Sequence, residues 1–369
     1  MSKRSILLVG GCALALIAVL AFVAPRHGAH APSGKTRALT DMEGRTIQVP
    51  DPLTRVGLFG GPTGQIAYIL GARSQLCAVT NTLKGSELVV QFDPTVKDLP
   101  GPRSTSGHIN IEALIGANCQ LVIAGSLDGS IVEKKTGIPV AYTESNMSYG
   151  FEQLKREIRF YADVFQKPER AEKYIAYLDK TVAFVKSRTQ DIPLEKRKKV
   201  FNGYSPSHLV TLGGDTFMHE RIEAAGCIDA AKDVNTSGAK EGMHTGLSEM
   251  SFEKVFGWDP DILVIDSGTP QDVYQDERWK NVKAVRNRQV FKQPVGIFIF
   301  DRPTAEAAVL YPLWLAKTAY PERFADVDMN AEVKRFYHET VGFDLNDEQA
   351  RAVVVGSFGL HFGTEQTQK

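Results

Sequence analysis

Residues 110–126 read NIEALIGANCQLVIAGS, and residues 251–267 read SFEKVFGWDPDILVIDS. The two stretches align without a gap at an offset of 251 − 110 = 141 residues, and a Glu, a Gly and the final Ser coincide. In each stretch a residue suited to an N-cap, Asn110 or Ser251, begins a short helix, and a glycine ends that helix before a buried strand. This repeat predicts two homologous lobes.

The segments around the repeat predict a parallel α/β architecture. Short apolar runs alternate with Gly-rich or helical segments, which is typical of strands in parallel sheets. A long amphipathic helix is predicted over Pro168–Ser187, because its apolar residues recur every three or four positions. The predicted strands are Arg55–Phe59, Leu76–Val79, Leu121–Ala124 and Pro139–Tyr142 before this helix, and Val200–Gly203, Ile262–Ile265 and Val290–Lys292 after it.

We therefore predict an α/β protein with two Rossmann-like lobes of mostly parallel sheets, joined by one long helix. The expected domains are residues 37–166 for the N-terminal lobe, 167–190 for the linking helix and 191–369 for the C-terminal lobe. Ligands of open α/β sheets bind beyond the carboxyl ends of the strands, so the cleft between two such lobes is the expected ligand site.

The composition and the N-terminus indicate an exported protein. The 369 residues carry 43 Lys plus Arg and 43 Asp plus Glu, so the chain has no net positive charge to attract nucleic acid. Lys3 and Arg4 precede the apolar run of residues 6–24, so residues 1–36 are expected to be a signal peptide or membrane anchor followed by a linker. The expected location is the periplasm, with cleavage, lipidation at Cys12 and retention as an anchor all left open.

The remaining cysteines and the histidines do not indicate a metal centre. Cys77, Cys119 and Cys227 are too widely spaced for a disulfide framework or a zinc site, so they are expected to be small buried apolar residues. The sequence has no pair of histidines at helical spacing and no tight carboxylate cluster. We expect no cofactor and no protein-coordinated metal.

Four features together resemble a known family. They are the hairpin-like segment DMEGRTIQVPDPLTRV (residues 41–56), the NIE and SFE units, the single linking helix and the closing segment VGFDLNDEQARAVV (residues 341–354). This combination, over about residues 40–354, resembles the iron-siderophore, haem and cobalamin class of periplasmic substrate-binding proteins of ABC importers. The resemblance implies a monomeric, non-enzymatic protein that captures a small molecule and delivers it to a membrane permease. It also implies that Glu112 and Glu253 dock onto permease arginines, although each carboxylate also suits the first turn of its helix.

The loops at the carboxyl ends of the predicted strands hold the expected ligand contacts. They are rich in small polar, aromatic and charged residues that can project into a cleft. Arg302 is expected to contact an anionic group, although pairing with Asp301 is an equally good explanation for it. The expected ligand-binding residues are Gly61, Thr63, Asn81, Thr105, Ser106, His108, Ser126 and Tyr149 in the first half, and Tyr204, His244, Thr245, Ser267, Phe298, Phe300 and Arg302 in the second.

The residues leave the identity of the ligand open. Tyr149, Tyr204, Phe298 and Phe300 favour a bulky metal chelate, with an iron-siderophore first and cobalamin or haem as variants. The donors Ser106, His108, His244 and Arg302 would instead suit molybdate or tungstate. The aromatic-Asp-Arg-Pro stretch and the following Trp-Leu-Ala (residues 314–316) also resemble those of a subset of the family that binds molybdate and tungstate. Metal chelatases, which are enzymes, also have paired Rossmann-like lobes, but an export signal argues against that cytoplasmic chemistry. An adhesin would not account for two similar lobes around a cleft.

Overall fold

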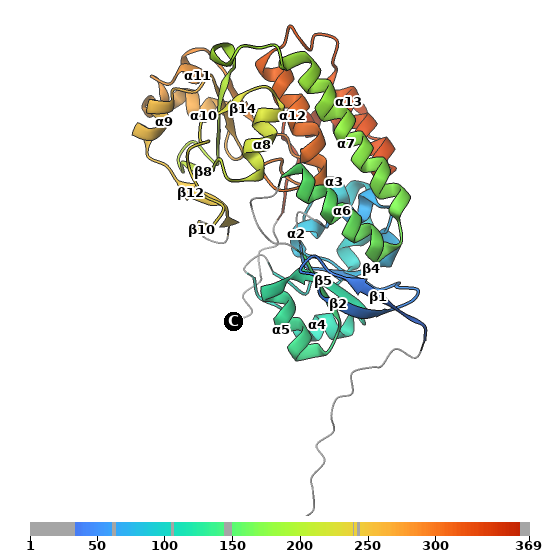
Figure 1. Ribbon diagram of the computed structural model, residues 1–369. Helices are drawn as coiled ribbons and strands as arrows, with labels where there is room; N and C mark the ends of the chain where they lie inside the picture. The colour runs from blue at the N-terminus through green and yellow to red at the C-terminus, as the bar shows by residue number, and fades with distance from the viewer. Residues whose placement is uncertain are drawn as a thin grey trace, which may run out of the picture. The chain divides into compact units, whose positions relative to one another are not determined.

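The computed structural model describes residues 34–60, 64–104, 107–143, 150–238, 240–241 and 244–361. These residues belong to one compact unit (Figure 1). Two separate sheets hold most of the strands, one of four strands and one of six. In the part of the chain that is described, no helix is both long and apolar enough to cross a membrane. The predicted α/β class is therefore confirmed.

The first sheet is entirely parallel and has the strand order β4-β3-β5-β6. Each of its strands lies where an apolar run predicted one: β3 (Val56–Leu58), β4 (Leu76–Ala78), β5 (Leu121–Gly125) and β6 (Val140–Thr143). A separate antiparallel hairpin of β1 (Thr36–Thr40) and β2 (Thr46–Pro50) precedes it. Asp41 closes the hairpin turn, because its buried carboxylate accepts the N–H groups of Glu43 and Arg45 and, from the neighbouring sheet, that of Tyr142.

The second sheet is mixed. Its order is β12-β8-β7-β13-β14, with β9 also paired to β7. The predicted strands β7 (Lys199–Gly203), β13 (Ile262–Ile265) and β14 (Val290–Lys292) are parallel to one another, as is β9 (Ile228–Asp229) to β7. The sequence did not predict β8 (Val210–Leu212) and β12 (Leu247–Glu249), which run antiparallel at one edge. Two further short strands, β10 (Lys240–Glu241) and β11 (His244–Thr245), form a hairpin.

The internal repeat forms the same local structure in both sheets. The Asn110 side chain accepts the N–H of Ala113 at 2.9 Å and caps α4 (Ile111–Gly116), which leads into β5. The Ser251 side chain accepts the N–H of Lys254 at 3.2 Å and caps α9 (Phe252–Trp258), which leads into β13. Because β5 and β13 belong to different sheets, the repeat marks two structural halves and not one continuous sheet.

Three helices are long, and the longest of them joins the two halves along the chain. They are α6 (Phe151–Phe165), α7 (Pro168–Thr189), which matches the predicted linking helix, and α12 (Ala305–Ala319), which packs along α7 (Figure 1). The other helices are α1 (Gln65–Ile69), α2 (Asn81–Lys84), α3 (Glu87–Phe92), α5 (Ser126–Thr136), α8 (Phe217–Ala224), α10 (Pro270–Gln275), α11 (Lys283–Arg286), α13 (Met329–Phe336) and α14 (Asp347–Val354).

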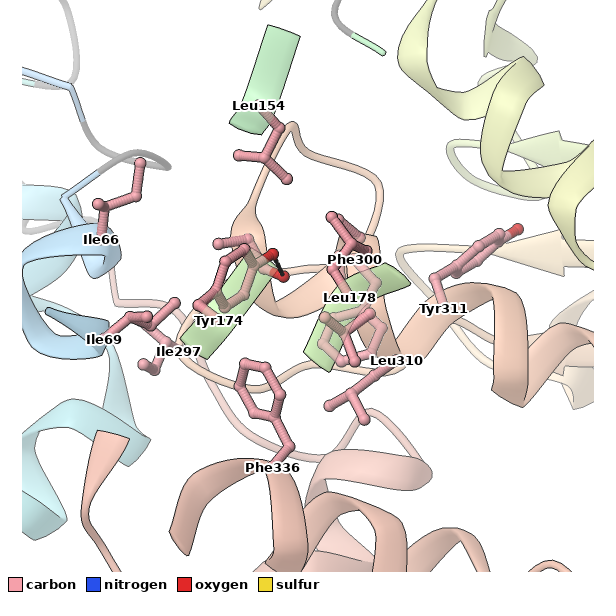
Figure 2. Packing of buried hydrophobic residues seen from close by; sticks show 14 of the residues in the cluster. Ile66, Ile69, Leu154, Tyr174, Leu178, Ile297, Phe300, Leu310, Tyr311 and Phe336 are labelled. Carbon is pink, nitrogen blue, oxygen red and sulfur yellow. Dashed lines mark hydrogen bonds between the residues drawn. The ribbon is translucent and has the colours of Figure 1, made fainter. Parts of the chain in front are cut away.

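Residues from both halves share one buried hydrophobic cluster. Figure 2 shows Ile66 and Ile69 of α1 together with Tyr174 and Leu178 of α7 and Phe336 of α13. The Tyr174 hydroxyl donates to the carbonyl of Ala305 at 2.7 Å, so even the polar tip of this buried ring has a partner. An apolar core that is shared in this way resists separation of the halves, because opening it would expose large side chains to water.

The expectation for two of the cysteines was wrong. Cys77 of β4 and Cys119, which precedes β5, form a disulfide with Cα atoms 6.1 Å apart, whereas Cys227 is free and buried. Strand β3 lies between β4 and β5, and its Gly57 leaves room for the bridge: a Cβ there would lie 3.1 Å from the Cys119 sulfur. Spacing along the chain did not indicate this pair, because the pairing of strands brings the two residues together.

Candidate ligand-binding site

The carboxyl ends of the parallel strands in the second sheet bring several polar groups together. Tyr204 follows β7, and Asp266 and Ser267 follow the neighbouring strand β13. The backbone N–H groups of Asp266 and Ser267 donate to the Tyr204 carbonyl at 3.2 and 3.0 Å, and the Ser267 hydroxyl is 3.3 Å from the same oxygen. Two of the expected contacts, Tyr204 and Ser267, therefore lie side by side at the carboxyl ends of neighbouring parallel strands, where α/β proteins bind ligands.

The loop between β14 and α12 adds a guanidinium and a carboxylate to this group. Arg302 donates through Nη1 to the Asp301 carboxylate, and its side chain retains 15% exposure, whereas that of Asp301 has 4%. The pairing with Asp301 is thus present. Because guanidinium is a planar cation with five N–H donors, an ion pair through Nη1 still leaves it capable of binding an anion.

Asp266 completes the group, which we call the β13 edge cluster: Tyr204, Asp266, Asp301 and Arg302. Burial, followed by the charge of the neighbouring Asp301, raises the pKa of Asp266 well above its ordinary value, against an opposing effect of Arg302. Burial, followed by the charge of Asp266, also raises the pKa of the Tyr204 phenol.

A buried arginine holds the loop that carries Arg302. Arg221 of α8 is 3% exposed and donates to three backbone carbonyls of the loop, at 3.0 Å to Phe300, 2.8 Å to Arg302 and 3.0 Å to Thr304. Its guanidinium also lies over the Phe217 ring. Burial lowers the pKa of Arg221 to about 10, which still leaves it charged at neutral pH. Arg221 therefore positions the Arg302 backbone from inside the protein.

The first sheet supplies fewer described candidates, and its loops place them separately. Asn81 begins α2, and its amide oxygen packs against Gly101, where a Cβ would lie 2.0 Å away. His108 is exposed, and its backbone N–H donates to the Ser104 hydroxyl at 3.0 Å. Ser126 is the first residue of α5, directly after β5.

Several expected contacts lie outside the described residues, namely Gly61, Thr63, Thr105, Ser106 and Tyr149. His244 and Thr245 are described only as the strand β11, which pairs with β10. The role of these residues as ligand contacts remains a prediction.

Two expected aromatic contacts are buried instead of facing a cleft. Phe298 is 5% exposed and Phe300 is 1% exposed, and Phe300 packs in the shared cluster near Leu178 (Figure 2). Phe300 lies in the core, whereas the next two residues, Asp301 and Arg302, form an ion pair within the β13 edge cluster. In this conformation neither phenyl ring can stack on a bulky ligand.

Sequence reasoning named Asp301 only as a possible partner of Arg302, and it missed Asp266 and Arg221 as functional candidates. Asp266 directly follows the buried strand ILVI, a position that parallel-sheet topology makes a ligand position, so its place in the chain was a usable signal. Arg221 carried no such signal, because it reaches the loop from a helix about 80 residues earlier in the chain.

The two glutamates expected to dock onto a permease are both exposed, in the first turns of α4 and α9. The pKa of Glu253 is lowered by its own backbone N–H and by the Ser251 hydroxyl, as the open end of a helix favours a carboxylate. Among the residues that the structure describes, no group of three or more His, Cys, Asp or Glu side chains could hold a metal ion.

Comparison with known proteins identifies relatives that share this architecture. The molybdate-binding protein MolA of Haemophilus influenzae is 25% identical over 329 residues, which cover 82% of this chain and 90% of MolA. Its structure with bound molybdate has a TM-score of 0.70 at 23% identity and covers 84% of this chain and 99% of that one. A periplasmic solute-binding protein from Veillonella parvula has a TM-score of 0.74 at 23% identity, covering 87% and 97% of the two chains.

The iron(3+)-hydroxamate-binding protein FhuD of Bacillus subtilis is 26% identical over 213 residues, which cover 54% of this chain and 64% of FhuD. At these identities the structural matches support the fold and not a particular ligand. A model of the periplasmic binding protein family matches residues 63–294, more than half of the chain, and this span includes both repeats and every strand of the two large sheets except β3. The chain belongs to the periplasmic binding protein family.

Proposed function

We propose that this chain is the extracytoplasmic substrate-binding component of an ABC importer, and that it captures a tetrahedral oxyanion of the molybdate or tungstate type without chemical change. The ligand would lie between the two sheets, at the carboxyl ends of their parallel strands, and the loaded protein would deliver it to the membrane permease. The named relatives are binding proteins, and MolA aligns over most of both chains.

The position of Arg302 is the observation that carries the choice of an oxyanion. Its guanidinium is partly exposed and lies near the phenol of Tyr204, a residue whose carbonyl faces the Ser267 hydroxyl. Hydrogen-bond donors around a small site suit a compact oxyanion. The buried positions of Phe298 and Phe300 remove two of the four aromatic rings that favoured a bulky chelate.

An iron chelate is the second candidate. The match to the hydroxamate-binding protein FhuD and the half-buried ring of Tyr204 favour it, because an aromatic face and an arginine also suit a carboxylate or hydroxamate shell around iron. Sequence analysis placed this ligand first, and both candidates belong to the same class of transport protein.

Export to an oxidising compartment agrees with the disulfide between Cys77 and Cys119, since such bonds persist outside the cytoplasm. Delivery would use the exposed carboxylates of Glu112 and Glu253, one on each repeat, to contact arginines of the permease. The proposed domains are the lobes of residues 37–166 and 191–369, joined by the helix of residues 167–190.

Calorimetry of the purified protein with molybdate, tungstate, sulfate and a ferric hydroxamate tests the proposal, together with elemental analysis of protein isolated from the periplasm. Arg302→Gln is expected to weaken molybdate binding by at least about tenfold, because it removes a charge-assisted hydrogen bond. Arg159→Gln, which breaks an exposed ion pair with Glu172, is the matched control and should bind normally.

Tight binding of the ferric hydroxamate without binding of molybdate would replace the first candidate with the second. Binding of none of the four compounds would refute both candidates.

A further inference from the structure

The two capped helices of the repeat expose a large apolar side chain at the same position. At the offset of the repeat, Ile115 of α4 corresponds to Phe256 of α9, and these side chains are 56% and 37% exposed. Among the described residues six large apolar side chains are exposed, and these are two of them. One exposed apolar residue is ordinary on a protein surface, but agreement between two related surfaces calls for a cause.

Neither helix needs its exposed apolar residue to pack against its own sheet. Leu114 of α4 and Val255 of α9, which also correspond in the repeat, are fully buried in the separate cores of the two halves. Agreement at these buried positions follows from a shared fold. Agreement one residue later does not, because an exposed side chain contributes little to folding. A common kind of partner accounts for Ile115 and Phe256.

A glycine follows the apolar residue in each helix. Gly116 and Gly257 are both exposed, and a Cβ on either would have no neighbour within 4 Å from elsewhere in the described residues. Neither glycine has a positive φ, so alanine would fit both positions and would favour the helix. The fold itself therefore does not require these glycines, whereas a bare helix backbone lets another surface approach closely.

The glutamate, the apolar residue and the glycine share one face of each helix, because they lie three and four positions apart. We call the two sets the docking triplets: Glu112, Ile115 and Gly116 of α4, and Glu253, Phe256 and Gly257 of α9.

We infer that Ile115 and Phe256 are the apolar contacts by which this protein docks onto its permease, and that Gly116 and Gly257 let the permease surface approach each helix. The permease would present, once for each half, a cationic side chain for the glutamate beside an apolar hollow for the neighbouring side chain. The inference rests on the proposed function, because that function supplies the permease as the partner.

The charge of the docking triplets favours a cationic protein surface over two other occupants. An anionic lipid surface would repel the exposed carboxylates of Glu112 and Glu253. A second copy of this chain that docked triplet against triplet would bring like carboxylates together, which is also unfavourable.

Binding to membranes tests the apolar contacts. The probe is fluorescently labelled protein isolated from the periplasm, mixed with right-side-out vesicles of the cytoplasmic membrane from the same cells. Ile115→Ser and Phe256→Ser should each weaken vesicle binding by at least about tenfold, because each removes an apolar side chain from the interface. Leu194→Ser is the matched control: Leu194 is 68% exposed but lies outside the repeat, so this variant should bind as the wild type does.

Gly116→Ala and Gly257→Ala separate docking from folding. Each adds one methyl group to open space on a helix, so the urea midpoint should not fall. Vesicle binding should nevertheless weaken by about tenfold, because the methyl group holds the two surfaces apart. Unchanged vesicle binding by both alanine variants would contradict the role given to the glycines.

Four results would overturn the inference. Two are a wild-type protein that does not bind the vesicles and a double variant, Ile115→Ser/Phe256→Ser, that binds them as the wild type does. Equal binding to liposomes of the extracted lipids would make the lipid surface the partner. Self-association of the wild-type protein in sedimentation, lost in the double variant, would make a second copy the partner.

Failure of this inference and failure of the proposed ligand are distinguishable, because calorimetry with molybdate does not involve the vesicles. If the serine variants lose vesicle binding but the wild-type protein binds no molybdate, the docking contacts stand and the choice of oxyanion falls. If the protein binds molybdate while the serine variants bind vesicles normally, the choice of oxyanion stands and the docking contacts fall.

Discussion

Replacement of Arg221 by methionine tests whether a buried arginine holds the ligand-binding loop. Methionine has a similar length and an apolar character, so it fills much of the same space without providing donors. The substitution leaves the carbonyls of Phe300, Arg302 and Thr304 without the donor that each now has at 2.8 to 3.0 Å. These carbonyls are at or near the core, where water is a poor substitute.

The expected loss in the free energy of unfolding is about 3 to 5 kcal/mol. Each hydrogen bond from a charged donor contributes about 1.5 to 3 kcal/mol, and relief from burying the charge of Arg221 offsets part of the sum. Urea denaturation followed by tryptophan fluorescence measures this loss as a lower midpoint with an unchanged slope. Molybdate affinity should also fall by at least about tenfold, because the loop no longer presents Arg302 in one position.

Arg159→Met is the control, since Arg159 makes an exposed ion pair with Glu172, and its urea midpoint should stay at the wild-type value. If Arg221→Met lost less than about 1 kcal/mol of stability, the three hydrogen bonds would not hold the loop. If stability fell but molybdate bound with unchanged affinity, Arg221 would support the fold without positioning Arg302.

Three further perturbations have defined outcomes. Reduction of the Cys77–Cys119 bond, which closes a loop over a sequence separation of 42, should lower the free energy of unfolding by about 4 kcal/mol. The urea midpoint should then be lower with reductant than without it, and equal midpoints would contradict this prediction. Burial raises the pKa of Glu306 to about 8 from its ordinary 4.5. Between these two pH values the native state holds a proton that the unfolded chain has released, so the free energy of unfolding should fall as pH rises through this range. Glu306→Gln should remove that decline in urea titrations at several pH values, and a decline of wild-type size would refute the assignment. Glu112→Gln and Glu253→Gln should each reduce molybdate uptake by cells while calorimetric affinity stays unchanged; normal uptake by the double variant would exclude docking through these carboxylates.

Local patterns in the chain were sufficient to predict seven strands of the two large sheets, the long linking helix and the two capped helices. Two strands have the predicted bounds, Ile262–Ile265 and Val290–Lys292. The helix predicted over Pro168–Ser187 begins at Pro168 and continues past Ser187 to Thr189. The N-caps Asn110 and Ser251 accept the backbone N–H groups that their positions implied. These features depend on residues close in sequence, so periodicity and capping preferences reveal them.

The strands β8 and β12 show where such reasoning ends. Each has three residues, like β3, β4 and β14, but neither was marked by the alternation of apolar runs and helical segments that predicted those strands. They form because β7 offers an edge on which an antiparallel pair can complete its backbone hydrogen bonds. The same limit applied to Cys77 and Cys119, whose approach depends on the order of strands in a sheet.

By itself, the sequence determined the α/β class, the two related halves and the linking helix, and it predicted the strand ends as the place of the ligand contacts. Only the tertiary structure decided which side chains occupy those ends: it buried Phe300 in the core, bonded Asp266 and Ser267 to the Tyr204 carbonyl, and brought Arg221 under the loop of Arg302. The physical reason is that propensity and periodicity act over a few residues, whereas hydrogen bonds at this site join residues 63 and 81 positions apart.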